Sequence, residues 1–278
     1  MATLPFTKMQ GAGNDYVYVD AFAAPVRSLL DRQDLSALAR RVSDRHCGIG
    51  SDGLIVLAVA STPDADCAMW MWNADGSRGA MCGNGLRCLA KLAFDHERVK
   101  ATEFMIETDS GLRRANLTCT QDGRVVSVRT EMGKVFVEPE PRTVEALGSE
   151  WSYHAGDAGN PHAVIFVQDV ATAPVVELGS ILQKHPAFPR GVNVEFAHLA
   201  NDGVLVQRTF ERGSGETLAC GTGACAVAKA GLVTGRVRGP RVKLRLRGGD
   251  LLVTCREDDS LVLEGPAVTV FEGELPLE

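Results

Sequence analysis

Two cysteines in this chain open the same four-residue phrase. Cys82-Gly83-Asn84-Gly85 and Cys220-Gly221-Thr222-Gly223 lie 138 positions apart, and each leads into an alanine- and leucine-rich stretch of helical character. A glycine-rich turn at a helix start presents unpaired backbone N–H groups and the positive end of the helix dipole, so it can bind a carboxylate and stabilise a thiolate. Two such thiols in matched halves suit a reaction that removes a proton from one face of a carbon and adds one to the other.

Other interpretations of the two cysteine turns are open. A single turn of this kind can serve tight helix–strand packing alone. Cys82 with Cys88, and Cys220 with Cys225, could form a four-thiolate zinc site, but five and four intervening residues are wider spacings than the CxxC of zinc knuckles. A redox sensor would use the pair through a reversible Cys82–Cys220 disulfide. The matched pair favours catalysis, without a metal.

The repeat extends beyond the cysteine turns. Asn73 lies nine residues before Cys82, and Glu211 lies nine residues before Cys220, each in a glycine-rich polar turn. Asn14 and Asn160 both follow an Ala-Gly pair, 146 positions apart. Both spacings are close to that of the cysteines, as a duplication with small insertions would give.

Size and composition limit the class of protein. The 278 residues are enough for two domains, and 45% hydrophobic with 23% charged residues is ordinary globular composition. The net charge is −6. Segment 236–247 is locally basic, and from Val242 on its charged residues alternate with apolar ones. We therefore expect the solvent face of a strand there and no nucleic-acid partner.

The chain shows no apolar run of membrane-spanning length and no signal-peptide core at residues 1–10. We expect a cytoplasmic protein without a membrane partner, whose eight cysteines are mostly free thiols. No complete nicotinamide, flavin or P-loop motif is present, and no lysine stands in a context typical of pyridoxal phosphate. The sequence therefore predicts no cofactor.

Strand-like patterns recur along the chain, whereas helical patterns are few. Strands are predicted at 16–20, 54–59, 68–72, 125–129, 163–167, 204–210, 251–255 and 267–271. Helices are predicted at 35–42 with Asp34 as N-cap, at 178–182, and after the cysteine turns at 86–94 and 224–233. This strand-rich pattern is α+β (mixed α/β) rather than doubly wound. Residues 138–149 hold prolines and several acids and are predicted to be a surface connection.

Six short segments, two of which lead into the cysteine turns, together resemble the diaminopimelate epimerase family, over nearly the whole chain and in the family's order. They are Gly11-Ala12-Gly13-Asn14-Asp15, Gly48-Ile49-Gly50-Ser51-Asp52-Gly53, Asn73-Ala74-Asp75-Gly76-Ser77 with the first cysteine turn, Gly159-Asn160-Pro161-His162, Gly191-Val192-Asn193, and Glu211-Arg212-Gly213-Ser214-Gly215-Glu216-Thr217 with the second cysteine turn. The resemblance implies cofactor-independent epimerisation of L,L-2,6-diaminopimelate to the meso isomer, in lysine and peptidoglycan-precursor biosynthesis.

The resemblance also implies a fold of two pseudo-symmetric domains. Each would be a curved mixed sheet around a central helix, with the active site in the cleft between them. The last strand would return to the first domain, giving residues 1–126 with 266–278 as the half carrying Cys82 and 127–265 as the half carrying Cys220. A homodimer is implied in the same way.

Residue roles carried over from the family divide into proton transfer and binding. Cys82 and Cys220 would be the two acid/base residues, one acting as thiolate and the other as thiol, and His162 and Glu211 would tune their protonation. Backbone N–H groups of Gly83, Asn84, Gly221 and Thr222 would hold the reacting carboxylate, and Glu211 would also border the substrate. The distal amino-acid centre would be bound by Asn14, Asn73, Asn160, Asn193 and Arg212.

One position departs from the family pattern. Some members carry a substrate-contacting glutamine where Gly53 stands, so that contact is in doubt, although residues 48–53 still predict a tight turn of close backbone approach. Proline racemases, hydroxyproline epimerases and phenazine-type isomerases share the architecture. The distal set favours diaminopimelate, because a cyclic imino acid has no second zwitterionic end.

Overall fold

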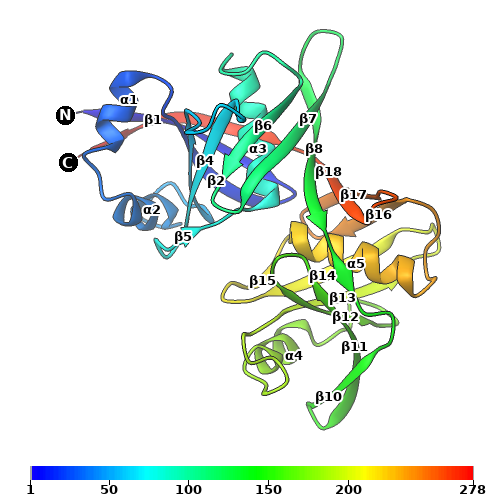
Figure 1. The fold of residues 1–278 in the computed structure, drawn as a ribbon. Helices are drawn as coiled ribbons and strands as arrows, with labels where there is room; N and C mark the ends of the chain where they lie inside the picture. Colours follow the sequence, from blue (N-terminus) through cyan, green and yellow to red (C-terminus); the bar gives the residue numbers. More distant parts are fainter. Residues whose placement is uncertain (1, 278) are drawn as a thin grey trace. The chain divides into compact units, whose positions relative to one another are not determined.

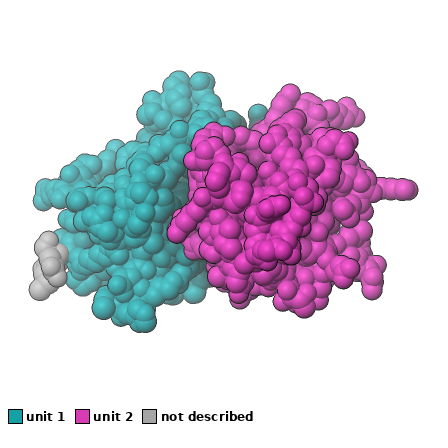
Figure 2. Space-filling view, turned by 90° about the horizontal axis from the view of Figure 1, so that it is seen from below, with its two compact units in different colours: residues 1–130, 265–278 teal, residues 131–264 magenta. Residues whose placement is uncertain are grey.

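The computed structural model describes residues 2–277, which form two compact units. The first consists of residues 2–130 and 265–277, and the second of residues 131–264 (Figure 2). The C-terminal strand returns to the first unit, because β19 (Val268–Pro276) pairs antiparallel with β1 (Thr3–Gly11). Within residues 2–277, no helix is long and apolar enough to cross a membrane.

The sheet of the first unit mixes parallel and antiparallel pairs. β1 also pairs with β2, β2 runs parallel to β3, and β4 is antiparallel to β3 and parallel to β6. β7 then joins β6 to β8 by antiparallel pairing. The strands are β2 (Asn14–Asp20), β3 (Gly53–Ala58), β4 (Cys67–Asn73), β5 (Arg78–Gly79), β6 (Glu103–Thr108), β7 (Gly111–Cys119) and β8 (Val125–Lys134).

Three helices belong to the first unit: α1 (Ala24–Leu30), α2 (Leu35–Ser43) and α3 (Gly83–Asp95). α3 packs against β1, β2, β3, β4 and β7 and is buried along most of its length (Figure 1). α2 packs against β2, β3 and β4 and contributes to a separate apolar cluster, which includes Leu38 and Val42. The helix that carries Cys82 at its start is therefore the central helix of its unit.

The second unit repeats this plan. β12 runs parallel to β13, β13 is antiparallel to β14, and β14 runs parallel to β16. The strands after β8 are β9 (Phe136–Val137), β10 (Arg142–Ala146), β11 (Ser149–Asp157), β12 (Pro161–Phe166), β13 (Asn193–Leu199), β14 (Leu205–Glu211), β15 (Gly215–Thr217), β16 (Arg241–Leu246), β17 (Gly249–Cys255) and β18 (Ser260–Gly265).

Two helices complete the second unit. α5 (Gly221–Val233) packs against β9, β11, β12, β13, β14, β16 and β17, so it occupies the place that α3 has in the first unit (Figure 1). α4 (Val175–Leu182) lies against β10, β13, β14 and β15. Each unit is thus a curved mixed sheet around a central helix, as expected.

Two expectations about local structure need correction. Residues 138–149 are not an irregular connection, because β10 and the start of β11 form a hairpin with Val144 opposite Trp151. Val144 and Ala146 are buried, and this alternation is obscured in the sequence by the charged residues between them. The short helix α1 was not expected. Its proline lies in the first turn, where a backbone N–H would have no helical partner, so the missing N–H does not disturb the helix.

Candidate active site

Cys82 is the N-cap of α3. Its backbone is extended, with φ −130° and ψ 122°, and its sulfur accepts a hydrogen bond from the Gly85 N–H at 3.5 Å. A Cβ on Gly85 would lie 2.6 Å from Ile55 Cδ1, so glycine allows the helix start to approach β3. The turn thereby directs backbone N–H groups and the helix dipole towards the thiol.

Asn14 binds the Cys82 thiol in a fixed orientation. The thiol donates to Asn14 Oδ1 at 3.2 Å, while Asn14 Nδ2 donates to Asp52 Oδ2 at 2.6 Å. Because the carboxylate can only accept from the amide nitrogen, Asp52 determines which end of the amide faces Cys82. Asp52 lies in the turn before β3 and is a site residue that the sequence did not single out.

A partly buried ionic cluster supports Asp52. Arg45 donates to Asp52 at 2.9 Å and to both oxygens of Asp15, and Lys8 pairs with Asp15 and donates to the Gly50 carbonyl. Burial tends to raise the pKa of Asp15, but the bonds from Arg45 and Lys8 outweigh it and hold that pKa below its usual value. Burial and repulsion by Asp15 instead raise the pKa of Asp52.

Tyr16 of β2 lies buried next to Cys82. Burial raises the pKa of its phenol well above 10, and the neighbouring Cys82 raises it further. Tyr18, two residues along the strand, donates to the Gly85 carbonyl at 3.1 Å. The phenol of Tyr16 therefore stays protonated and can only be a neutral hydrogen-bonding neighbour of the thiol at ordinary pH.

Asn84 and Asn73 occupy different surroundings. Asn84 is buried, and its Oδ1 accepts from Arg87 Nη2 at 2.8 Å, with Arg87 itself fully buried in α3. Asn73 ends β4, and its Nδ2 donates to Ser77 Oγ at 2.9 Å across a turn closed by Asp75. We call Asn14, Asp52, Tyr16, Cys82 and Asn84 the first half-site; Asn73 lies in the turn that precedes it.

Gly53 leaves no space for a side chain. A Cβ at this position would lie 2.1 Å from the Trp72 carbonyl oxygen, and one at Gly48 would lie 2.1 Å from the Arg41 carbonyl oxygen. The segment is therefore a turn of close backbone approach, as predicted. The glutamine contact of some family members has no counterpart at this position.

Cys220 is the N-cap of α5 and repeats the geometry of Cys82. Its φ is −117° and its ψ is 117°, and its sulfur accepts from the Gly223 N–H at 3.3 Å and lies 3.4 Å from Thr222 Oγ1. Burial, followed by the charges of Glu211 and Glu195, raises the pKa of Cys220 well above 9; the bonds from Thr222 and Gly223 oppose this only in part. Cys220 is therefore held as a thiol.

Glu211 ends β14 beside Cys220. Burial raises the pKa of its carboxyl, a hydrogen bond from Thr217 lowers it, and repulsion by Glu195 adds to the rise. A bond with the Cys220 thiol connects the two groups. Gln183 donates to the Glu211 carbonyl at 2.6 Å and fixes the backbone at this strand end.

His162 is buried on β12 between two oxygen atoms. Its Nδ1 is 2.8 Å from Glu195 Oε1, and its Nε2 is 3.0 Å from Asn160 Oδ1. Glu195 is fully buried on β13, and its other oxygen accepts from Gln207 Nε2 at 2.9 Å and Thr209 Oγ1 at 2.5 Å. Glu195 was not predicted as a site residue; the signal available was one acidic residue inside the apolar run of β13.

Asn193 and Arg212 are connected through the backbone. Asn193 Nδ2 donates to the Pro161 carbonyl at 3.1 Å, and its Oδ1 accepts from the Arg212 N–H at 2.8 Å. The Arg212 guanidinium is exposed and donates to the Arg190 carbonyl at 2.9 Å. Asn160, His162, Asn193, Glu211 and Arg212 thus lie at or next to neighbouring ends of β12, β13 and β14. We call Asn160, His162, Asn193, Glu195, Glu211, Arg212, Cys220 and Thr222 the second half-site.

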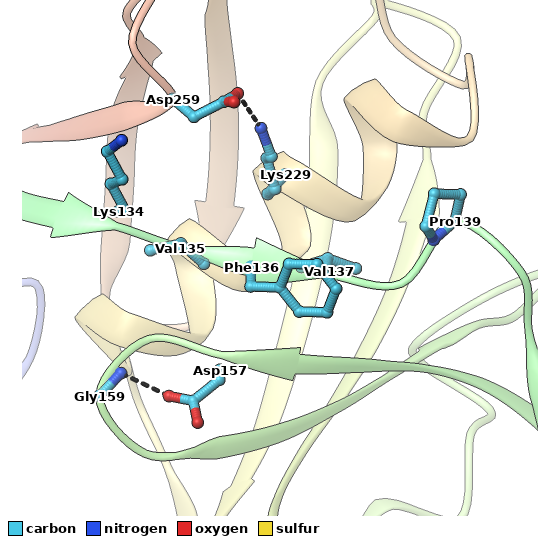
Figure 3. A pocket seen from close by; sticks show the side chains of 9 residues that line it. All are labelled: Lys134, Val135, Phe136, Val137, Pro139, Asp157, Gly159, Lys229 and Asp259. Carbon is cyan, nitrogen blue, oxygen red and sulfur yellow. Dashed lines mark hydrogen bonds and ion pairs between the residues drawn. The ribbon is translucent and has the colours of Figure 1, made fainter.

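Two pockets of the second unit border this region without containing Cys220. The larger, about 730 Å³, is lined by residues of β8, β9, the β11–β12 turn and α5, including Phe136, Gly159 and the Lys229–Asp259 ion pair (Figure 3). The smaller, about 250 Å³, reaches His162 from the side of Arg142 and Arg190.

Of the other cysteines, Cys67 and Cys88 are buried packing residues. Burial raises the pKa of Cys67 to about 12 and that of Cys88 to about 11, which makes both poor nucleophiles at neutral pH. Within residues 2–277, no group of three or more His, Cys, Asp or Glu side chains is arranged to hold a metal ion.

Comparison with known proteins shows the family to which the chain belongs. A family profile described as diaminopimelate epimerase matches residues 6–137 and 155–270. A diaminopimelate epimerase of Geobacillus kaustophilus is 44% identical and aligns with 98% of this chain and 97% of its own length. One from Methanococcus maripaludis is 38% identical and aligns with 99% of this chain and 100% of its own length.

Solved structures with the same fold are more distant in sequence. A hydroxyproline epimerase from Agrobacterium vitis superposes with a TM-score of 0.76 at 20% identity, over 99% of this chain and 93% of that chain. An epimerase-like protein from Pseudomonas aeruginosa superposes with a TM-score of 0.72 at 17% identity, over 99% of this chain and 100% of that chain. These likenesses concern the two-domain fold.

Proposed function

The chain belongs to the diaminopimelate epimerase family, and we propose that it converts L,L-2,6-diaminopimelate to the meso isomer by proton transfer between two cysteines. The protein is an isomerase. The observation that carries the mechanism is the repeated cysteine turn, since Cys82 and Cys220 each cap a central helix and each accept a backbone N–H on sulfur. The product would serve lysine and peptidoglycan-precursor biosynthesis.

Proton transfer requires one thiolate and one thiol at the same α-carbon. The thiolate takes the α-proton, the electron pair passes onto the carboxylate as an enediolate-like species, and the thiol gives its proton to the opposite face. The first cysteine ends as a thiol and the second as a thiolate. Atoms and charge balance without a cofactor, because the only species transferred is a proton.

The two helix starts also supply the anion stabilisation that this step needs. The backbone N–H groups of Gly83, Asn84, Gly221 and Thr222 belong to the first turns of α3 and α5, where helical partners are absent. A carboxylate held there gains hydrogen bonds as negative charge develops on it. We assign the reacting carboxylate to these groups.

The distal amino-acid centre is assigned to amide and guanidinium groups. Arg212 is exposed and offers a forked donor to a carboxylate, and the asparagines can accept from an ammonium group and donate to a carboxylate. The asparagines proposed for this role are Asn14, Asn73, Asn160 and Asn193. A substrate with a single amino-acid centre would make no use of this set of groups.

Purified protein and synthetic substrates test the proposal directly. Incubation with L,L-diaminopimelate, followed by chiral chromatography, should show the meso isomer without added cofactor, and Cys82→Ala protein should show none. Parallel incubations with proline, glutamate and histidine should show no racemisation. Turnover of one of these with none of diaminopimelate would overturn the substrate assignment.

We also propose a homodimer in the cytoplasm, which the family resemblance supports. Light scattering on the eluting chromatographic peak should give twice the chain mass of 29.7 kDa. A peak at the chain mass across the micromolar range would contradict the dimer.

A further inference from the structure

The buried carboxylate of Glu195 lies directly beneath the second cysteine turn. A Cβ placed on Gly223 would lie 2.5 Å from Glu195 Oε1, so the absent side chain at Gly223 is what lets the carboxylate approach the helix start. Gly223 is also the residue whose N–H donates to the Cys220 sulfur. Glu195 and the Cys220 sulfur are therefore both direct neighbours of Gly223.

Glu195 is held in place from three sides. His162 Nδ1, Gln207 Nε2 and Thr209 Oγ1 all lie within hydrogen-bond distance of its two oxygens, at 2.8, 2.9 and 2.5 Å. Its side chain and that of His162 are fully buried. A carboxylate with this many fixed partners cannot turn away from Cys220 without breaking several buried hydrogen bonds.

The first unit shows that this carboxylate is not required by the fold. Strands β2 and β3 of the first unit correspond to β12 and β13 of the second, and the Val17–Leu54 pair matches the Ala163–Val194 pair. One residue further along β3 and β13, Ile55 is therefore the counterpart of Glu195. One residue back along β2 and β12, Tyr16 is the counterpart of His162. Gly85 accordingly faces Ile55 Cδ1 at 2.6 Å where Gly223 faces the carboxylate. The same strand position under the same helix start is apolar in one unit and acidic in the other.

We propose that Glu195 is a positioning residue for proton transfer, which orients His162 and keeps Cys220 in the thiol form in the resting enzyme. This inference rests on the proposed function, in which Cys220 then begins as the proton donor. Cys82, whose thiol donates to Asn14 Oδ1, must lose that proton before it acts as the acceptor. The charged groups that act on Cys220 are Glu211 on β14 and Glu195 on β13, and Glu195 also repels Glu211. His162 on β12 lies against Glu195.

The test is the pH dependence of alkylation at individual cysteines. Wild-type protein and Glu195→Gln protein are treated with iodoacetamide from pH 5 to pH 11, and modification of Cys220 and Cys82 is measured by peptide mass spectrometry. The midpoint of each profile reports the thiolate fraction, whereas the plateau reports access. The readout therefore does not require turnover.

We expect the Cys220 midpoint in wild-type protein to lie above the ordinary thiol value of about 8.5. In Glu195→Gln it should fall by about one pH unit or more, because a nearby like charge is removed. The Cys82 midpoint should stay unchanged. Thr209→Val, which removes one donor to Glu195 but keeps its charge, is the matched control and should leave the Cys220 midpoint near that of wild type.

Two results would overturn the proposal. One is an unchanged Cys220 midpoint in folded Glu195→Gln protein, with folding checked by circular dichroism. The other, which needs no variant, is a wild-type Cys220 midpoint at or below the ordinary thiol value. If either result is found while the wild type still epimerises diaminopimelate, the Glu195 proposal fails and the epimerase assignment stands. If the Cys220 midpoints are as expected but diaminopimelate is not turned over, only the epimerase assignment fails.

Discussion

The two cysteine turns have nearly the same backbone and opposite electrostatic surroundings. Cys82 and Cys220 share extended dihedral angles and a sulfur-capped helix start. Behind the first turn lies the buried guanidinium of Arg87, which donates to Asn84 Oδ1 and the Gly83 carbonyl. Beneath the second lies the buried carboxylate of Glu195. Two turns with the same backbone shape and buried groups of opposite charge can favour different protonation states of the two cysteines.

The same contrast extends to the strand ends. In the first unit, Asn73 at the end of β4 pairs with Gly53 at the start of β3. In the second unit, Val194 of β13 pairs with Phe210 of β14, so Glu211, the next residue, stands at the position that corresponds to Asn73. A neutral amide in one half thus corresponds to an acid in the other. In the proposed mechanism, the repeated turns provide the two thiols, and the differences at these strand positions distinguish the donor from the acceptor.

The largest effect is expected when either thiol is removed. Cys82→Ala and Cys220→Ala should each lower kcat for epimerisation by at least about 10³-fold, since general acid or base catalysis is lost on one face. Chiral chromatography of the product measures this. Near wild-type turnover in either variant would contradict the two-thiol mechanism, and Cys255→Ala, at a partly buried site in β17, serves as the control.

Replacing the acid beside Cys220 should have the next largest effect. Glu211→Gln should lower kcat by about 10²-fold, because it removes a charge and a hydrogen-bond partner of the thiol. Glu145→Gln on the exposed face of β10 is the control and should retain full activity. Equal activity of the two variants would show that Glu211 does not influence proton transfer.

Alanine at the two equivalent glycines should separate the half-sites by stability. Gly223→Ala forces a methyl group against a carboxylate held by three partners and should cost about 1–3 kcal/mol of unfolding free energy. In Gly85→Ala the obstacle is the end of the Ile55 side chain, which can rotate, so the gain in helix propensity of about 1 kcal/mol should offset most of the cost. Urea denaturation compares them, and equal losses would contradict the rigid placement of Glu195.

The smallest effect is expected for a charged pair outside the half-sites, and it tests whether only the charges next to the two cysteines influence activity. A hydrogen bond that His96 donates to the Asp20 carboxylate raises the pKa of His96 in the first unit, outside the first half-site. A raised pKa stabilises the fold below the unfolded value of about 6.5, and this contribution is lost as pH rises through the folded value. Asp20→Asn should therefore lose about 0.5 kcal/mol more at pH 6 than at pH 9.

The readout for Asp20→Asn is the unfolding free energy at the two pH values, with activity measured in parallel. The bond from Arg98 to Asp20 contributes at both pH values and cancels in the difference. The activity should match that of wild type. A larger loss at pH 9 than at pH 6 would contradict the His96–Asp20 assignment, and a loss of activity would show that the half-sites respond to distant charges.

The parts of the fold that depend on local sequence could be predicted. Both central helices follow from their cysteine turns, and α2 follows from its apolar spacing and the Asp34 cap, whose side chain accepts from Ser36 and Ala37. The β10–β11 hairpin was missed because prolines and charges outweigh a short alternating pattern. A seven-residue helix such as α1 is too short for a periodic signal.

The sequence indicated the repeated residues of the site more readily than those that differ between the halves. Cys82, Cys220 and Asn14 stand at positions that recur, so comparison within the chain detects them. Glu195 and Asp52 have no such signal, because their importance depends on the strand register and on a hydrogen bond between distant segments. Only the folded chain shows that Glu195 lies beneath Cys220.

In the proposed mechanism, two thiols transfer protons on opposite faces of one carbon. This mechanism is tested most directly by stopping the reaction of L,L-diaminopimelate in D₂O at low conversion and measuring deuterium in substrate and product by mass spectrometry. Two thiols would place one deuterium at an α-carbon of the meso product and leave almost none in the remaining L,L substrate. Equal early labelling of both pools would show that a single group exchanges its proton on both faces, and would contradict the two-thiol mechanism.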